Sequence, residues 1–205
     1  MQLYLASTSP ARRHTLTQVG LAPLILDHNV DEDALVQDAT VHGPVPPSDI
    51  VQLLARAKAE DAVHSGVTGL VIGGDSVFAV DGEVFGKPHT AENAQARWMR
   101  QRGKTGVLHS GHWVADVKDG AIVAGVGGHT EASVTFRDDI TDEEIAAYIA
   151  TGEPLKVAGA FTIDARGAAF IERINGDPYT VVGMSVAKLR ELIRQLGYSF
   201  TDLWV

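Results

Sequence analysis

Residues 69–80, GLVIGGDSVFAV, decide the fold class that we predict for this chain. The segment is rich in apolar and β-branched residues, which is typical of a largely buried strand. Asp81-Gly82 follows as a hairpin signal, and EVFG at 83–86 predicts a short return strand. We therefore expect a sheet that contains a buried strand and an antiparallel hairpin.

Strand and helix signals alternate along the rest of the chain. Predicted strands lie at 2–6, at the start of 22–35 before an acidic loop, and at 105–117, 121–136 and 159–174. Predicted helices begin after the N-caps Ser9, Ser48, Thr90, Thr141 and Ser185 and end near Gly20, Ser65, Arg102, Thr151 and Gly197. Hairpins together with crossovers favour an α/β fold with a mixed sheet.

Composition limits the function classes. The 205 residues, 45% of them hydrophobic, suit one sizeable domain or two small lobes that share a cleft. The chain has no cysteine, so disulfides and thiolate chemistry are excluded, and the cytoplasm is the expected location. A net charge of −9 disfavours nucleic acid polymers but allows a small anionic ligand. No apolar run approaches the roughly 20 residues that span a bilayer, so no membrane association is expected.

The first predicted helix carries Arg12 and Arg13 in its first turn, after Ser9 and Pro10. The N-terminus is the positive end of the helix dipole and already favours anions, so the dipole does not explain two cations there. Arg12, near the third helical position, is placed to reach an anion held at the same terminus, with phosphate as the natural ligand. The alternative is that both arginines are solvated or pair with the acidic loop.

Asp75 is the most informative residue, because an ionised carboxylate in an apolar strand is costly unless it meets a metal, a cation or water. With Glu32, it is a candidate pair of ligands for a hard cation such as Mg²⁺. The alternatives are that Asp75 lies exposed at a strand end or bulge, and that Glu32 belongs to a solvated loop.

Two lysines are further candidates. Lys87 in GEVFGKP only superficially matches a Walker A loop, because Pro88 replaces the metal-binding Ser or Thr. Lys87 can still neutralise a phosphate as a point charge. Lys58 in LLARAKAED has surface acids nearby and, taken alone, predicts an ordinary surface residue.

Other motifs argue against rival chemistries. His109 and His112 are three apart in a predicted strand and so face opposite sides, which disfavours a zinc site. GVGG at 125–128 favours a bulge or bend over a nucleotide fingerprint, because no helix signal follows. There is no G-x-S-x-G element of a serine hydrolase.

Five segments taken together resemble the Maf family, in the same order and over nearly the whole chain. They are LASTSPARRHTL (5–16), NVDED (29–33), LLARAKAE (53–60), GGDSVFAVDGEVFGKP (73–88) and TGEPLKVAGAFTIDARGAAFIERINGDPYTVVGMS (151–185). The resemblance implies a single Maf-like domain over 1–205, with a mixed twisted sheet, flanking helices and two lobes around a central cleft, as in ITPase-like folds.

The resemblance also implies an activity. Maf-like enzymes are nucleoside triphosphate pyrophosphatases, hydrolases that cut the triphosphate to the monophosphate and pyrophosphate with a divalent metal, Mg²⁺ or Mn²⁺. They are thought to remove modified or surplus nucleotides from the pool. The implied partner is a nucleoside triphosphate, and a homodimer is one option for the oligomeric state.

Site residues follow from the matching positions. Asp75 resembles the family's proton acceptor, and Ser7 and Arg12 match its phosphate-binding start. Glu32, Lys58 and Lys87 match polar groups of the family's cleft, and we predict that the two lysines act in catalysis together with Asp75. Arg12 and Ser76 also fall where the family tunes its choice of base.

Three departures alter what can be transferred. Ala11 replaces one arginine of the commoner Pro-Arg-Arg, and Ser76 replaces the usual threonine. Asp164 stands where glutamine is frequent. Glutamine both donates and accepts hydrogen bonds, whereas an ionised aspartate only accepts, so a dTTP or UTP preference is not carried over.

Two alternatives from other classes remain open at the sequence level. One is a nucleotide-binding regulator of cell division or septum formation without turnover. The other is a phosphatase that acts on a different class, such as sugar phosphates.

Overall fold

The computed structural model describes all residues from 1 to 205. The chain divides into two compact units. The first comprises Met1–Asp75, Ser110–Thr130 and Gly183–Val205, and the second comprises Ser76–His109 and Glu131–Val182. Three long strands contain boundaries between the units, namely β3 (Gly69–Val80), β5 (Thr105–Lys118) and β6 (Ala121–Phe136).

A mixed seven-stranded sheet confirms the predicted fold class. The strand order is β2-β1-β3-β5-β6-β7, and β4 pairs with β3. The short strands are β1 (Leu3–Ala6), β2 (Leu24–Ile25), β4 (Glu83–Phe85) and β7 (Ile171–Gly176). β1 pairs in parallel with β2 and β3, whereas β4 and β7 pair antiparallel with β3 and β6. The hairpin predicted at Asp81-Gly82 is therefore confirmed.

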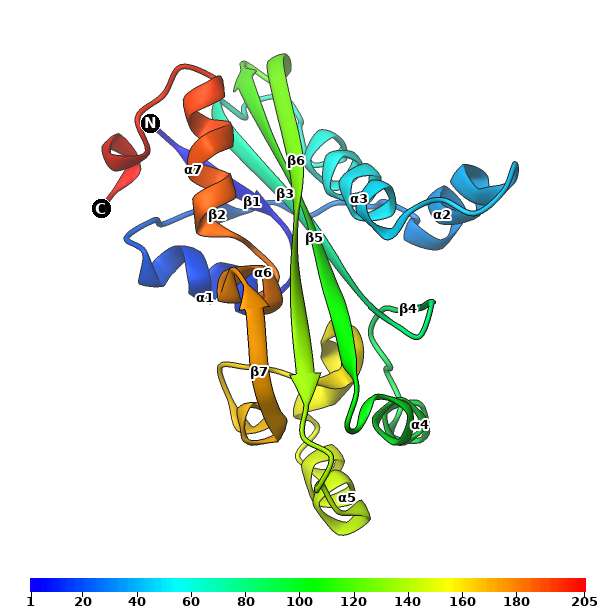
Figure 1. Cartoon of the computed structure of the whole chain (residues 1–205). Coiled ribbons are helices and arrows are strands. Elements are labelled where there is room, and N and C mark those ends of the chain that lie inside the picture. The colour runs from blue at the N-terminus through cyan, green and yellow to red at the C-terminus, as the bar shows by residue number, and fades with distance from the viewer. The chain divides into compact units, whose positions relative to one another are not determined.

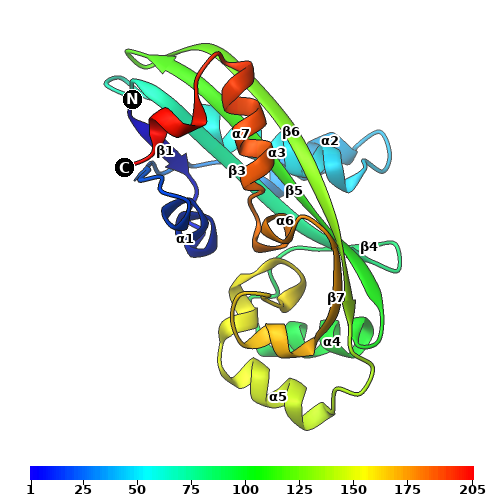
Figure 2. The ribbon, with the colours of Figure 1, turned by 60° about the vertical axis from the view of Figure 1, so that its left-hand side comes forward.

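In the first unit, helices cover both faces of the sheet (Figures 1 and 2). α1 (Pro10–Gln18) and α7 (Val186–Gln195) lie on one side, and α3 (Pro47–Asp61) lies on the other. Leu70 and Ile72 join the apolar cluster with α1 and α7, whereas Val71 joins the cluster with α3. This alternation follows from the two-residue period of a strand and explains why β3 is apolar throughout.

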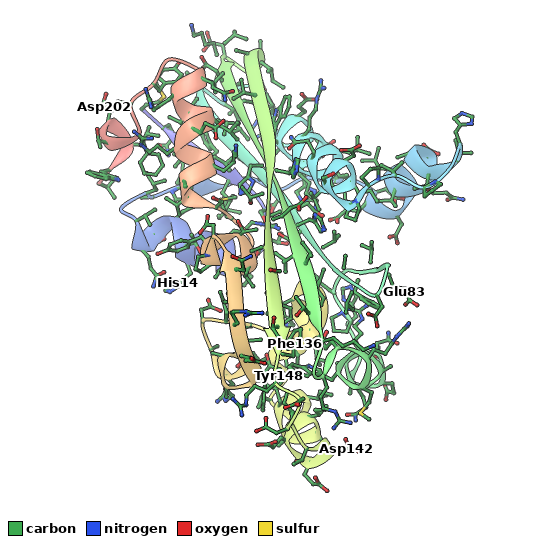
Figure 3. All side chains as sticks on the ribbon, viewed as in Figure 1. His14, Glu83, Phe136, Asp142, Tyr148 and Asp202 are labelled. Carbon is green, nitrogen blue, oxygen red and sulfur yellow. The ribbon has the colours of Figure 1, made fainter.

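The second unit has an aromatic core around α4 (Ala91–Gln101) and α5 (Asp142–Ala150). Trp98 is fully buried and packs edge-on against the rings of Phe136, Tyr148 and Phe170. Its indole Nε1 donates a 2.8 Å hydrogen bond to the carbonyl of Ala160. Figure 3 labels Phe136 and Tyr148 in this core.

The predicted helix caps are mostly confirmed. The side chains of Ser9, Thr90 and Ser185 each accept a hydrogen bond from a first-turn amide, and Thr141 with Glu144 forms a complete capping box. Both long strands in the middle of the chain also form as predicted. No helix combines the length and apolar character needed to cross a bilayer.

Two predictions around residues 27–65 are wrong. The acidic stretch forms a helix, α2 (Glu32–Thr40), because the Asp31 side chain caps it by accepting from the Ala34 amide at 3.0 Å. The next helix begins at Pro47 with Pro46 as N-cap, not Ser48, and it ends at Asp61. Proline at the first helical position has the required φ and no amide to satisfy, so it defines this start.

The strand predicted at 159–174 is also wrong over most of its length. Only Ile171–Gly176 is a strand, and it is preceded by short 3-10 turns at η1 (Glu153–Lys156), η2 (Ala158–Ala160) and η3 (Arg166–Phe170), while α6 (Pro178–Val182) follows. Gly159 and Ala160 have φ values of +71° and +59°, which a strand does not allow. Apolar composition here reflects burial of a turn, not a strand.

The GVGG segment at 125–128 lies within the continuous strand β6. A Cβ at Gly125 or Gly127 would come within 2.7 or 2.5 Å of the Trp113 ring. These two glycines therefore leave room for the indole. The strand continues to Phe136, so no helix begins at the segment, as a nucleotide fingerprint would require.

Candidate active site

A buried cation and two carboxylates form the centre of the site in the first unit. Asp75 on β3 is 8% exposed, and Lys58 on α3 is 5% exposed. The Lys58 Nζ atom lies 2.7 Å from Asp75 Oδ1 and 2.8 Å from Glu32 Oε1. The ammonium therefore bridges two carboxylates and offsets the cost of burying Asp75, so the alternatives of an exposed Asp75 and a surface Lys58 are wrong.

Glycines allow α3 to come close enough for this contact. A Cβ at Gly73 would lie 2.0 Å from the Ala55 carbonyl oxygen, and one at Gly111 would lie 2.1 Å from that of Val51. Gly73 and Asp75 are two residues apart and share one face of β3. The helix backbone thus rests directly on the sheet, and Lys58, one turn beyond Ala55, reaches the carboxylate.

Arg12 is buried beside these acids. Its Nε donates to the Gly183 carbonyl at 2.9 Å, and its Nη1 donates to Ser7 Oγ at 3.1 Å. Burial lowers the pKa of Arg12, and the negative charges of Asp75 and Glu32 raise it in opposition. The alternative that both arginines are solvated is wrong for Arg12, whereas Arg13 is exposed.

His28 is a neighbour of the site that the sequence interpretation missed. Its Nδ1 is buried and has no hydrogen-bond partner in the protein. Burial lowers the pKa of His28 first, and the positive charge of Lys58 lowers it further, although Glu32 acts in the opposite direction. His28 follows a predicted strand and belongs to no recognisable motif, so only its electrostatic interaction with Lys58 and Glu32 in the folded protein identifies it.

The remaining predicted residues belong to the second unit. Lys87 follows β4, is exposed, and its ammonium makes no hydrogen bond or ion pair within the protein. Ser76 is half-buried directly after Asp75, and Asp164 is exposed between two 3-10 turns. The structure thus brings Asp75, Lys58, Glu32, Ser7 and Arg12 together in one unit.

The donor chemistry of Asp75 and Glu32 fits a hard divalent cation. Mg²⁺ is bound by one or two carboxylates together with phosphate oxygens and water. No cluster of three or more metal-ligating side chains exists in the chain. The two strand histidines have other partners, because His109 lies 3.3 Å from Glu131 and His112 accepts from the Ser185 amide at 2.8 Å.

Glu153 organises a second polar cluster that the sequence did not reveal. Its carboxylate accepts hydrogen bonds from the hydroxyls of Thr162 and Tyr148 and from the amides of Gly167 and Arg166, at 2.7, 3.0, 3.0 and 3.3 Å. Burial raises the pKa of Glu153, but these hydrogen bonds outweigh it and hold the pKa below the ordinary value. The donors lie on both sides of Asp164, so Glu153 fixes the turn that carries it.

Replacing Glu153 with glutamine is expected to destabilise the protein by about 1–3 kcal/mol at pH 7, because charge-assisted hydrogen bonds are lost. The ordinary pKa is 4.5, and the folded value is lower. The stabilisation is therefore present above pH 4.5 and is lost as the pH falls through the folded pKa. Urea unfolding should show that the two proteins differ less in their free energy of unfolding as the pH is lowered from 7. Glu172→Gln, an exposed control, should show neither effect.

Known proteins resemble this chain over nearly its whole length. The Maf-like protein family matches residues 2–196. A nucleoside triphosphate pyrophosphatase from Leifsonia xyli is 55% identical over 100% of this chain and 97% of its own length. Proteins of the same name from Salinispora tropica and Streptomyces coelicolor are 46% and 45% identical, over 100% and 99% of this chain and 88% and 94% of their own lengths. Since the match extends over almost every residue, the chain belongs to the Maf family.

Proposed function

We propose that this protein hydrolyses nucleoside triphosphates to the monophosphate and pyrophosphate. The observation that carries the proposal is the buried Asp75–Lys58 ion pair, which the exposed Glu32 joins through Lys58, with Arg12 in its electrostatic range. Full-length relatives are named nucleoside triphosphate pyrophosphatases, which supports the same reaction here. Burying the charges of Asp75, Lys58 and Arg12 is costly, and apolar residues would serve a purely structural role better.

Asp75 is the proposed proton acceptor for the water that attacks the α-phosphorus. An aspartate has the required acceptor capacity, and Lys58 holds its Oδ1 in place at 2.7 Å. Asp75 and Glu32 would hold Mg²⁺ or Mn²⁺, whose charge would offset that of the phosphates. The Lys58 ammonium bonds to one oxygen of each carboxylate, so the other oxygen of each would be the one that faces the cation.

Phosphate binding is assigned to Ser7, Arg12 and Lys87. The Arg12 guanidinium is buried and donates to Gly183 and to Ser7, the second predicted phosphate-binding residue, and the Lys87 ammonium has no competing partner in the protein. Neutralising the charge that develops on the leaving pyrophosphate is the main electrostatic contribution that such groups make.

Ser76 and Asp164 are proposed to contact the nucleoside. An ionised Asp164 only accepts hydrogen bonds, so it favours a base whose edge presents N–H donors. The family's glutamine at this position serves acceptors as well as donors. Base preference in this chain is therefore expected to differ from that of relatives that keep the glutamine.

Product analysis tests the reaction. Ordinary and modified nucleoside triphosphates are incubated with the enzyme and Mg²⁺ or Mn²⁺, beside a set of phosphomonoesters. We expect pyrophosphate and the nucleoside monophosphate in equal amounts, and no phosphomonoester hydrolysis. Release of orthophosphate, or tight nucleotide binding without turnover, would contradict the proposal.

Three broader predictions accompany this proposal. We propose that the two units act as one Maf-like domain over residues 1–205, that the protein forms a homodimer, and that it acts in the cytoplasm. Light scattering of the purified protein tests the second of these.

A further inference from the structure

Arg97 on α4 contacts the backbone on which Lys87 stands. Its Nη1 donates to the Gly86 carbonyl at 2.5 Å, and its Nη2 donates to the Lys87 carbonyl at 3.3 Å. Its guanidinium carbon also lies 5.3 Å from the centre of the Phe85 ring. One planar group therefore contacts three successive residues at the end of β4.

Arg97 bonds to backbone carbonyls and forms no ion pair, unlike its neighbours Arg100 and Arg102. Arg100 pairs with Glu83 and Arg102 pairs with Asp142, whereas Arg97 makes no ion pair. Burial lowers the pKa of Arg97, and no neighbouring acid opposes this effect. A half-buried guanidinium whose donors bond to two carbonyls contributes by fixing backbone geometry.

The rest of the same loop is equally well bonded. The Gly159 amide donates to the Gly86 carbonyl at 3.3 Å, and Asn93 Nδ2 donates to the Pro88 carbonyl at 3.1 Å. The His89 amide donates to the Leu155 carbonyl at 3.1 Å, which holds a residue with a φ of +63°. The backbone from 86 to 89 is thus fixed, while the Lys87 ammonium itself stays without a partner.

We infer that Arg97 is a positioning residue for Lys87, which it holds where the ammonium meets the phosphates of the substrate. This inference rests on the role proposed above for Lys87. A lysine side chain is flexible and carries a point charge. It stabilises the negative charge that develops on the substrate best when the backbone that carries it is rigid. The two-pronged contact to consecutive carbonyls provides that attachment, and a single ammonium at position 97 cannot reproduce its fork.

A double-mutant cycle tests the inference. Lys87→Ala is expected to lower kcat by about 100-fold, and Arg97→Met by about 10-fold. In both variants the loss of activity should be divided between kcat and KM in the same proportion. In the Lys87→Ala background, Arg97→Met should cause no further loss. Arg97→Lys retains the charge without the fork and should behave like Arg97→Met.

Arg100→Met is the matched control. Arg100 lies on the same helix, 5.8 Å from the same Phe85 ring, and pairs with Glu83, which Figure 3 labels on β4. It has no bond to residues 86 or 87, so its replacement should change kcat less than twofold. Hydrogen exchange should accelerate at residues 86–89 in Arg97→Met and Arg97→Lys but not in Arg100→Met.

The outcomes separate the two hypotheses. If Lys87→Ala keeps full activity, the proposed role of Lys87 is wrong. If Lys87→Ala loses activity but both Arg97 variants keep theirs, or if the losses simply multiply, Arg97 does not act through Lys87. Thermal melting shows whether each variant is folded, and the conservative Arg97→Lys replaces Arg97→Met if the latter is not.

Discussion

Asp75→Asn is expected to lower the rate of pyrophosphate release by about 10³-fold while the protein stays folded. The asparagine side-chain oxygen can still accept the hydrogen bond from Lys58, so the buried lysine keeps a partner. The amide cannot take a proton from water and has no negative charge for a divalent cation. Initial rates at saturating nucleotide, together with thermal melting, measure both parts of the prediction.

Asp81→Asn provides the control for this substitution. Asp81 lies at the exposed hairpin after β3 and has a φ of +50°, which asparagine tolerates well. It forms an ion pair with Lys104 at the surface. Activity should stay within twofold of the original protein. A folded Asp75→Asn variant with more than a tenth of the original rate would remove Asp75 from the mechanism.

Gly73→Ala is expected to reduce both stability and activity. The new methyl group would lie 2.0 Å from the Ala55 carbonyl oxygen and 2.9 Å from the Ala59 Cβ, so α3 must move away from the sheet. Overpacking of this kind costs about 1–3 kcal/mol, and more where backbone is displaced. Because Lys58 lies on the displaced helix, kcat should fall about 10-fold or more beyond any loss of folded protein.

Gly128→Ala is the matched control in the same unit. Its Cβ would lie 3.3 Å from the flexible Lys188 side chain and at an ordinary contact distance of 3.9 Å from Leu192 Cδ2, and its φ is not positive. The free energy of unfolding in urea should change by less than about 0.5 kcal/mol. If Gly73→Ala were as stable and active as Gly128→Ala, close contact between helix and sheet would not be needed for the site.

Local patterns predicted the regular elements where the deciding chemistry is itself local. Ser9, Thr90, Thr141 and Ser185 cap helices because a side-chain oxygen bonds an amide within three residues. The same kind of local reasoning failed where hydrogen bonds from residues far away in the sequence determine the local structure. Apolar residues at 159–170 suggested a strand, but Trp98 and Glu153 bond to this segment and hold it in turns.

The candidate site also contains one residue that the sequence pattern identifies and another whose contacts depend on the tertiary structure. Asp75 stands out from its sequence alone, since every neighbour in the strand is apolar or small and a carboxylate there needs a partner. Lys58 appeared to be a surface residue, because periodicity does not say that α3 lies directly on Gly73 and Gly111. Family resemblance supplied the role of Lys58, and the structure supplied its partners.

By itself, the sequence determined the fold class, the capped helices and the presence of an acid in an apolar strand, because backbone propensity and desolvation act within a few residues. Only the tertiary structure decided that Lys58 lies between Asp75 and Glu32, that Glu153 gathers four donors, and that Arg97 bonds to the loop of Lys87. Each of these contacts joins separate elements, and its geometry depends on how closely one backbone can approach another.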